Sequence, residues 1–446
     1  MNETICALAT APGGAIGIIR ISGPQALEIL SRVFLGKGDV QMFSANTIHY
    51  GHIVAGSDII DEVMVSVFKA PHSYTGEDAV EISCHGSRYI LNKVLALLIE
   101  KGCRQAGPGE FTQRAYLNGK MDLSQAEAVA DLIASTNKAT HQMAMSQLRG
   151  HFSSELAQLR EQLLKLTSLL ELELDFSDHE DLEFADRSEL SDLTKTIDKH
   201  ITRLAESFET GQALKQGIPV AIVGKTNVGK STLLNRLLKD DRAIVSDVHG
   251  TTRDTIEDTI DINGITFRFI DTAGIRQTTD KIEQIGISRT YAAIDKARIV
   301  LWLIDSEPEE SEMAEMLQRC EDKSLIIIQN KIDKSDNTTS KQGTIAISAK
   351  YGQGIDALEQ AIYQAANIPT LQENDVIVTN ARHYAALIHA HDHLQRVLDG
   401  MAQNISGDLL SEDLRLTLDT LAEITGGQIT PNEVLGNIFK NFCVGK

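Results

Sequence analysis

The sequence predicts a multidomain α/β protein with an N-terminal α/β domain, a central all-α domain and a doubly wound domain inserted into the helical one. Three observations support this fold class. Short alternating strands and a helix fill residues 1–118. Leucines recur at helical spacing in residues 124–210, which contain no proline. Residues 217–371 then alternate buried strands with helices before helical patterning returns. A chain of 446 residues exceeds one ordinary core, so several domains are expected.

The N-terminal domain is expected over residues 1–118. Residues 15–23 form an apolar run that ends in Ser-Gly-Pro, and residues 61–68 alternate like a half-buried strand. Residues 79–83 read as a further short strand. Apolar side chains at helical spacing predict a helix over residues 88–101. This mixture predicts an α/β domain.

The helical domain is expected in two parts, residues 119–216 and 372–446, on either side of the doubly wound domain. Insertion of this kind is tolerated where the termini of the inserted domain lie close together. An acidic segment, residues 175–186, interrupts a long amphipathic helix. We interpret it as a solvated interhelical loop, with a metal site as the less favoured alternative. His389 and His393 are four residues apart, and a solvated helix face is favoured over a metal site there too.

Composition restricts the class of protein. The net charge of −20, from 62 acidic and 42 basic residues, argues against a chain that coats nucleic acid by bulk charge. Its cysteines are scattered without a CxxC pair, which favours a reducing compartment. No apolar run approaches the roughly 18 residues of a membrane span, and the first residues lack a basic signal-peptide region. We therefore expect a cytoplasmic protein with no membrane span.

Five short segments in the inserted domain, residues 217–371, together predict a Ras-like P-loop GTPase domain. One of them, Gly224 to Ser231, fits the phosphate-loop pattern GxxxxGK[ST] and joins a strand to a helix. The other four follow in order: Thr251-Thr252, Asp271-Thr272-Ala273-Gly274, Asn330-Lys331-Ile332-Asp333 and Ser348-Ala349-Lys350. A single phosphate loop arises by chance more easily than five elements in order, so the set predicts guanine-nucleotide binding.

The phosphates and Mg²⁺ are assigned to the first three segments. Lys230 is expected at the β- and γ-phosphates, and Ser231 at Mg²⁺. Thr252 is the preferred second magnesium ligand, with Thr251 as the alternative. The Asp271 carboxylate is expected to hold the metal through water, while the Gly274 amide contacts the γ-phosphate.

Base selection is assigned to the last two segments. The Asp333 carboxylate can accept from guanine N1–H and from the exocyclic amine, neither of which adenine offers. The Ala349 amide is expected to donate to the guanine carbonyl. The complete set expected to contact GTP is Asn227, Val228, Gly229, Lys230, Ser231, Thr232, Ser246, Asp247, Val248, His249, Gly250, Thr251, Thr252, Asp271, Thr272, Ala273, Gly274, Asn330, Lys331, Asp333, Ser348, Ala349 and Lys350.

Hydrolysis needs a group that orients water, and the position directly after Gly274 does not supply one. Many such switches place Gln there, whereas this chain has Ile275. Polar candidates downstream are Arg276, Asp280 and Glu283, of which we favour Glu283. No arginine finger is evident. A monovalent cation near Asn227 and the oxygen-rich residues 246–250 is one possible substitute.

The whole chain, residues 1–446, resembles the tRNA-modification GTPases called MnmE or TrmE. The resemblance extends beyond the nucleotide motifs, and its tail, Phe442-Cys443-Val444-Gly445-Lys446, is its most specific part. The other matching segments are Ile19 to Gly23, Tyr74 to Asp78, His85-Gly86, Arg104 through Pro108 to Thr112, Leu117 to Leu123, and Gln125 to Ala128.

This resemblance implies a cofactor, partners and a reaction. It implies an N-terminal domain that binds 5-formyl- or 5,10-methylene-tetrahydrofolate and makes a homodimer. It also implies a heterotetramer with the FAD-dependent enzyme MnmG (GidA). Together the two would add a carboxymethylaminomethyl or aminomethyl group to C5 of the wobble uridine of certain tRNAs. The implied GTP hydrolysis is activated by K⁺ when two G domains meet.

The resemblance also assigns roles residue by residue. It places folate contacts at Arg20, Glu81, Lys120 and Lys446. It places K⁺ contacts at Asn227, Ser246, Val248 and Thr251, and the base role at Glu283. Without the resemblance, the four folate residues would be interpreted as ordinary surface charges. Physically, Glu81 could pair with pterin donors while the cations neutralise carboxylate.

Two alternatives stay open from the sequence. Cys443 could be a nucleophile if neighbouring lysines lower its pKa, or a thiol with no chemical role. The chain could also be a regulatory or scaffold GTPase without folate chemistry, and folate binding by the N-terminal domain would separate that reading from the first. A folate enzyme that does not use its nucleotide site is the least favoured reading, because all five nucleotide segments are intact.

Overall fold

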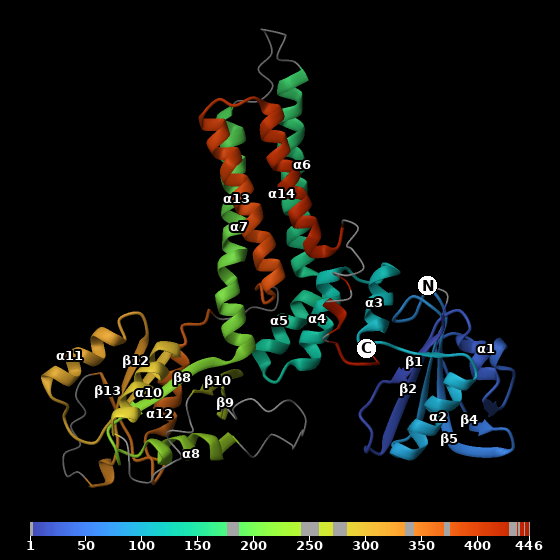
Figure 1. Cartoon of the computed structure of the whole chain (residues 1–446), viewed down its shortest axis with the longest axis horizontal. Helices are drawn as coiled ribbons and strands as arrows, with labels where there is room; N and C mark the ends of the chain where they lie inside the picture. Colours follow the sequence, from blue (N-terminus) through green and yellow to red (C-terminus); the bar gives the residue numbers. More distant parts are fainter. Residues whose placement is uncertain are drawn as a thin grey trace. The chain divides into compact units, whose positions relative to one another are not determined.

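The computed structural model describes residues 3–175, 187–241, 258–270, 283–334, 343–369, 375–427, 435, 438–440 and 442–445. The chain forms two compact units (Figure 1). The first unit contains Met1–Ala134, Ala144–Ile201 and Ala385–Lys446. The second contains Ser135–Met143 and Thr202–Tyr384. Each unit is therefore built from segments that are discontinuous in sequence.

A seven-stranded sheet forms the N-terminal part of the first unit, in the order β3-β4-β5-β6-β2-β1-β7. All its neighbouring strands are antiparallel except β1 and β7. The elements here are β1 (Ile5–Leu8), β2 (Ile16–Ser22), α1 (Ala26–Ser31), β3 (Phe34–Gly36), η1 (Val40–Met42), β4 (Thr47–Ala55), β5 (Asp58–Phe68), β6 (Ala79–His85), α2 (Arg88–Glu100), β7 (Arg104–Gln105) and α3 (Glu110–Leu117). The strands and helix predicted for this region are present.

Alternation along the strands gives this sheet two different faces. Val63, Val65 and Val67 of β5 are buried in a core that also contains Leu91 and Val94 of α2. The intervening residues of β5 point to the other face, as the two-residue period of a strand requires. That second face includes Arg20 of β2 and Glu81 of β6, which are direct register partners.

The helical part of the first unit buries leucine stripes between long helices. The helices after α3 are α4 (Leu123–Ala134), α5 (Lys138–Leu148), α6 (His151–Asp175), α7 (Arg187–Gln216), α13 (Ala381–Ala402) and α14 (Gly407–Thr425), of which α5, α7 and α13 are divided between the two units. Leu159, Leu163 and Leu166 of α6 are fully buried, as are Leu394 of α13 and Leu414 of α14. Figure 1 shows α6 and α14 side by side. The amphipathic pattern read from the sequence therefore produces an all-α core.

Two details of this region differ from the sequence prediction or fall outside it. The helical run from residue 124 is divided before the acidic segment, because Gly150 adopts a φ of 85° between α5 and α6. Such a backbone favours glycine and ends a helix. Residues 176–186 of the acidic segment lie outside the described residues.

The tail of the chain contacts the N-terminal sheet region. Val444 forms an antiparallel bridge with Pro108, and the Gly109 amide donates to the Cys443 carbonyl at 3.3 Å. A Cβ on Gly445 would lie 2.1 Å from the Leu8 carbonyl oxygen, so this approach requires glycine. The tail and the start of α3 are thus packed together.

The second unit contains a six-stranded sheet, in the order β13-β12-β11-β8-β10-β9, in which only β9 is antiparallel to its neighbour. Its elements after α7 are β8 (Ile218–Gly224), α8 (Lys230–Asp241), β9 (Asp258–Ile262), β10 (Ile265–Phe269), α10 (Glu283–Lys296), β11 (Ile299–Ile304), α11 (Glu310–Arg319), β12 (Ser324–Gln329), η2 (Ile332–Lys334), β13 (Thr344–Ala346) and α12 (Ile355–Ala365).

Helices cover both faces of this parallel sheet. Ile222 and Leu301 point into one core with α8 and α12, whereas Val223 and Trp302 point into a second core with α10. This is the doubly wound arrangement predicted from the alternating pattern. The predicted fold class is confirmed: an α/β domain, an all-α domain and an inserted P-loop domain.

Candidate functional site

The phosphate loop leaves the carboxyl end of β8 and enters α8 at Lys230. Gly224 has a φ of 147°, and a Cβ there would lie 2.3 Å from the Leu303 carbonyl oxygen. A Cβ on Gly229, which has a φ of 105°, would lie 2.3 Å from the Asn330 side-chain nitrogen. These two glycines allow the loop to pass close to neighbouring segments, with its amides near a helix N-terminus. The described part of the loop fits a phosphate cradle.

Lys230 folds back over this loop. Its Nζ donates to the Gly224 carbonyl at 2.6 Å and to the Lys225 carbonyl at 2.7 Å. Partial burial lowers the pKa of the Lys230 ammonium. A cation held at the loop by carbonyl oxygens is placed to meet phosphate oxygens, which would replace those weaker partners.

Asn330 joins the phosphate loop to the base-recognition segments. Its side chain is buried, and its Nδ2 donates to the Val228 carbonyl at 2.7 Å. Its Oδ1 accepts from the Ala349 amide at 3.0 Å. The Ala349 amide, expected to donate to the guanine carbonyl, is therefore already bonded to Asn330. The structure brings three of the predicted segments together through one side chain.

Asp333 and Ser348 also meet. The Ser348 hydroxyl donates to Asp333 Oδ1 at 2.6 Å, and this bond lowers the pKa of the Asp333 carboxyl. The carboxylate is exposed and ionised, with Oδ2 available to accept further bonds. Lys331, at a φ of 66°, forms an ion pair with Asp305 at 2.8 Å. This end of the parallel sheet can thus present a fixed carboxylate to a base.

Several predicted nucleotide residues lie outside the described residues. They are Ser246, Asp247, Val248, His249, Gly250, Thr251, Thr252, Asp271, Thr272, Ala273 and Gly274. Glu283 begins α10, but its side chain lies outside the described part of the structure. Asn227 and Thr232 are exposed around the phosphate loop, and Ser231 follows Lys230 in the first turn of α8.

A second cluster surrounds Arg20 in the first unit. Arg20 Nη2 lies 2.7 Å from Glu81 Oε1, and its Nη1 donates to the Gly445 carbonyl at 3.2 Å. The guanidinium carbon lies 5.5 Å from the centroid of the Tyr74 ring and 5.6 Å from that of Phe111. Two of the four predicted folate residues are thus paired, beside two aromatic rings and the chain's tail.

The other two predicted folate residues are not in this pair. Lys120 Nζ donates to the Pro71 carbonyl at 2.9 Å, at the loop that also carries Tyr74. Lys446 lies outside the described residues. Cys443 is exposed within the tail that reaches Arg20.

Comparison with known proteins places the chain in a family. Residues 4–120 match the GTP-binding protein TrmE N-terminus, and residues 123–443 match the MnmE helical domain. A protein of Bacteroides thetaiotaomicron named tRNA modification GTPase MnmE is 54% identical over 465 residues, with 100% of both chains covered. The chain belongs to the MnmE family. A protein of the same name from Christiangramia forsetii is 50% identical over 474 residues, again with 100% of both covered.

A solved structure is also similar in fold to part of this MnmE-family chain. The G domain of the T. maritima FeoB iron transporter is 22% identical to it, with 33% of this chain and 98% of that chain covered and a TM-score of 0.25. Within the described residues, no helix is both long and apolar enough to cross a membrane.

The structure reveals residues around the candidate nucleotide site and the Arg20 cluster that the sequence motifs did not identify. Arg236 of α8 donates from Nη2 to the Lys350 carbonyl at 2.9 Å and so holds the last nucleotide segment. Asp305, after β11, pairs with Lys331. Tyr74 and Phe111 belong to segments that resemble the family, but only the fold reveals that they lie close to Arg20. No spacing rule in the sequence relates these residues to their partners.

His391 and His393 are held by carboxylates within the helical domain. His391 Nδ1 lies 2.6 Å from Asp198 Oδ1, and His393 lies beside Arg396 and Asp413. Burial and the Arg396 charge lower the pKa of His393. Within the described residues, no group of three or more His, Cys, Asp or Glu side chains has metal-binding geometry.

Proposed function

We propose that this protein hydrolyses GTP to GDP and phosphate in the course of tRNA modification. With an FAD-containing partner, MnmG, it would take part in adding a carboxymethylaminomethyl or aminomethyl group to C5 of the wobble uridine. The observation that carries GTP binding is the Asn330 bridge between the phosphate loop and the base-recognition segments. Membership of the MnmE family supports the role in tRNA modification.

Different residues of the chain are proposed to bind the phosphates, select the base and orient the attacking water. Lys230 and the loop amides neutralise charge on the phosphates, so the γ-phosphoryl group is held in place for attack. Asp333 accepts two bonds from guanine, and a base without those donors leaves the carboxylate unpaired. Many related switches use a glutamine at the position of Ile275 to orient the attacking water. In this chain Glu283 would take that role.

Two metal ions are proposed at this site. Ser231 and Thr252 would hold Mg²⁺, and Asn227, Ser246, Val248 and Thr251 would hold K⁺. Asn227 is compatible with such a role because it is exposed in the phosphate loop and its oxygens are of the kind that hard cations prefer. When bound, Mg²⁺ and K⁺ would supply positive charge that offsets the negative charge of the phosphates during phosphoryl transfer.

A tetrahydrofolate site is proposed around Arg20 and Glu81. Oε1 of Glu81 takes both bonds from Arg20, and Oε2 accepts none from a described residue. That oxygen can accept from the amide-like donors of a pterin. Lys120 and Lys446 are proposed to neutralise the ligand's carboxylates. The bound folate supplies the one-carbon unit for the modification.

A homodimer through the N-terminal domain is also proposed. The sheet face that carries Arg20 also exposes Tyr50 and Met64, which are register partners, together with Ile48 and Ile16. Exposed apolar side chains that form one patch mark interaction surfaces. A second copy of the same face would cover this patch.

The first test compares GTP hydrolysis in K⁺ and in Na⁺ at equal ionic strength. Faster turnover in K⁺ is expected, because K⁺ would add positive charge beside the transferring group. Glu283→Ala should remove most of the K⁺-stimulated rate, with a loss on the order of 10²–10⁴-fold for a group that acts on the water.

Glu310→Ala is the matched control, since it removes an exposed carboxylate of α11 that has no assigned role at the nucleotide, and it should keep K⁺ stimulation. Equal rates in the two salts, or an active Glu283→Ala, would refute the proposed chemistry. The tRNA role is tested separately by nucleoside analysis of tRNA from cells that lack this protein, where unmodified wobble uridine is expected.

A further inference from the structure

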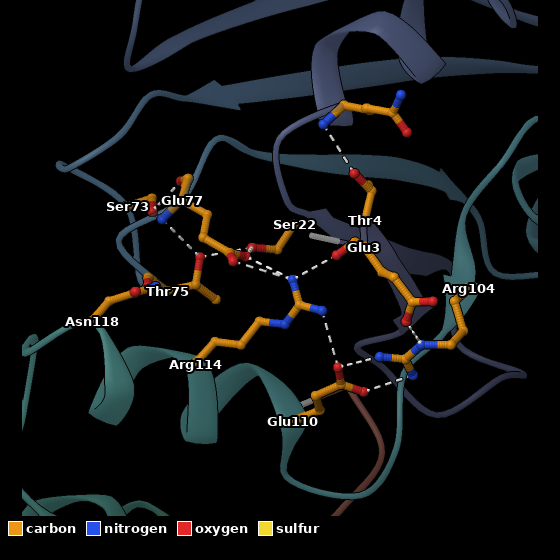
Figure 2. Close-up of polar contacts among 11 residues, drawn as sticks. Glu3, Thr4, Ser22, Ser73, Thr75, Glu77, Arg104, Glu110, Arg114 and Asn118 are labelled. Atoms are coloured by element: carbon orange, nitrogen blue, oxygen red, sulfur yellow. Dashed lines mark hydrogen bonds and ion pairs between the residues drawn. The ribbon is translucent and has the colours of Figure 1, made fainter. Parts of the chain in front are cut away.

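Arg114 of α3 is the most buried charged side chain beside the Arg20 cluster. It is 1% exposed, a rare state for an arginine unless it is paired. Its Nη1 donates to Glu77 Oε2 at 3.0 Å and to the Glu3 carbonyl at 2.9 Å, and its Nη2 donates to Glu110 Oε1 at 3.0 Å (Figure 2). One guanidinium therefore connects the segment that precedes β1, the loop at residues 73–78 and the start of α3.

On one side, Arg114 fixes the loop through Glu77. Glu77 Oε2 also accepts from the Ser22 hydroxyl at 2.8 Å, and the Ser22 oxygen can in turn accept from the Thr75 hydroxyl at 2.7 Å. Asn118 donates to the Thr75 carbonyl at 2.7 Å. Figure 2 shows that, of these groups, Glu77 contacts the guanidinium directly, while Asn118 bonds Thr75 farther from it. The backbone of residues 73–78 is thus held at several points.

On the other side, Arg114 fixes the first turn of α3 through Glu110. Glu110 Oε2 accepts from the Gly107 amide at 2.9 Å and from Arg104 at 3.0 Å. The same turn packs against the tail, because a Cβ on Gly109 would lie 2.8 Å from Cβ of Phe442. Arg114 is therefore bonded to the same turn of α3 that the tail contacts.

The residues that neighbour Arg20 come from the loop at residues 73–78, the first turn of α3 and the tail. Tyr74 belongs to the loop that Glu77 holds, and its hydroxyl bonds Thr112 of α3 at 2.8 Å. Phe111 follows Glu110, and the Gly445 carbonyl comes from the tail. The same loop begins at Pro71, where Lys120 is bonded. Arg114 touches neither Arg20 nor Lys120, yet it holds the segments that lie between them.

We propose that Arg114 is a positioning residue of the folate site, which sets the spacing of Tyr74, Phe111 and the tail around Arg20. This inference rests on the proposed function of that cluster. The planar guanidinium of Arg114 bonds Glu77 and Glu110 at the same time, which a lysine ammonium on its flexible side chain does not reproduce. Without this guanidinium, the loop and the first turn of α3 can move independently.

The test is binding of 5-formyltetrahydrofolate to the full chain, measured by calorimetry well below the unfolding temperature. Arg20→Ala should abolish binding. Arg114→Met should weaken it by roughly tenfold or more, the scale of losing a partner that orients a direct ligand. GTP hydrolysis by Arg114→Met should stay within about twofold of the wild type, as expected for a change remote from the nucleotide.

Two further variants separate positioning from stability. Arg114→Met combined with Glu77→Gln leaves no unpaired carboxylate at residue 77, so the unfolding temperature should recover while folate affinity stays low. Arg104→Met is the matched control, because Arg104 binds the same Glu110 but is exposed and does not reach Glu77. Its folate affinity should stay within about twofold of the wild type.

The outcomes are distinguishable. Normal folate binding by Arg114→Met, or full recovery of affinity in the double variant, would overturn the positioning role while leaving the folate site intact. A wild-type chain that binds no folate would overturn the proposed folate function and this inference together. Hydrogen exchange gives an independent readout: amides of residues 73–78 and 109–111 should exchange faster in Arg114→Met than in the wild type, and those of β5 should not.

Discussion

At the scale of single residues, the Asn330 amide determines how two distant loops meet. Val228 and Ala349 are separated from it by 102 and 19 positions in sequence, yet both bond the same side chain. Because the site is buried, neither backbone group can turn to water if that side chain is removed. The orientation of the base-recognition segment therefore depends on one amide.

Asn330→Ala should lower GDP affinity by about 10–100-fold, because leaving buried groups unpaired costs about 1–3 kcal/mol. Titration with a fluorescent GDP analogue measures the change. Asn235→Ala, which alters an exposed asparagine of α8, is the control and should bind normally. Affinity within about twofold of the wild type for Asn330→Ala would mean that the bridge does not position the site.

The nucleotide residues could be predicted from sequence more completely than the Arg20 cluster. Lys230, Asn330 and Asp333 belong to motifs in which spacing reflects phosphate and base geometry. Arg20 and Glu81 were indicated only by the resemblance, as folate contacts. Their pairing depends on the register of β2 and β6, which neither spacing nor the resemblance reveals. Arg114 gave no signal, because its partners Glu77 and Glu3 lie 37 and 111 positions away.

At the scale of elements, the first turn of α3 depends on one carboxylate. Burial alone would raise the pKa of Glu110, but bonds from Arg104, the Gly107 amide and Arg114 outweigh it and lower the pKa below its ordinary 4.5. A lowered pKa in the folded state means that the ionised form stabilises the fold. This contribution is complete above the ordinary pKa and is lost as the pH falls through the lowered one.

Glu110→Gln should therefore be less stable than the wild type at neutral pH, and the gap should shrink in acid as wild-type Glu110 becomes protonated. Denaturant unfolding of the first unit, followed across a pH series below about 4.5, measures this. Glu28→Gln removes an exposed carboxylate that pairs with Arg32 and should leave the pH profile unchanged. A gap that stays constant with pH would contradict the assigned role of ionised Glu110.

At the scale of the whole molecule, the open face of the N-terminal sheet should determine oligomeric state. Met64 and Tyr50 are more than half exposed as paired neighbours at the middle of that face. A lysine there would place an unpaired charge within the contact between two copies, which is costly to desolvate.

If the proposed dimer forms through this face, Met64→Lys should convert it to monomer, or weaken it by at least roughly tenfold, as expected for an interface anchor. Sedimentation velocity over a concentration series measures the equilibrium. Met42→Lys is the control, because Met42 is 79% exposed but lies on η1, away from the sheet face. A Met64→Lys chain that remains dimeric at the wild-type concentration would place the dimer contact elsewhere.

The packing of α6 against α14 has a consequence for how the chain is made. Arg415 and Glu171 join the two helices across 244 positions of sequence. At a synthesis rate of roughly 5–20 residues per second, α6 emerges on the order of 10–50 seconds before its partner. For that interval its leucine stripe stays without the helix that later covers it. The stripe can be buried against α14 only after the second unit has been translated.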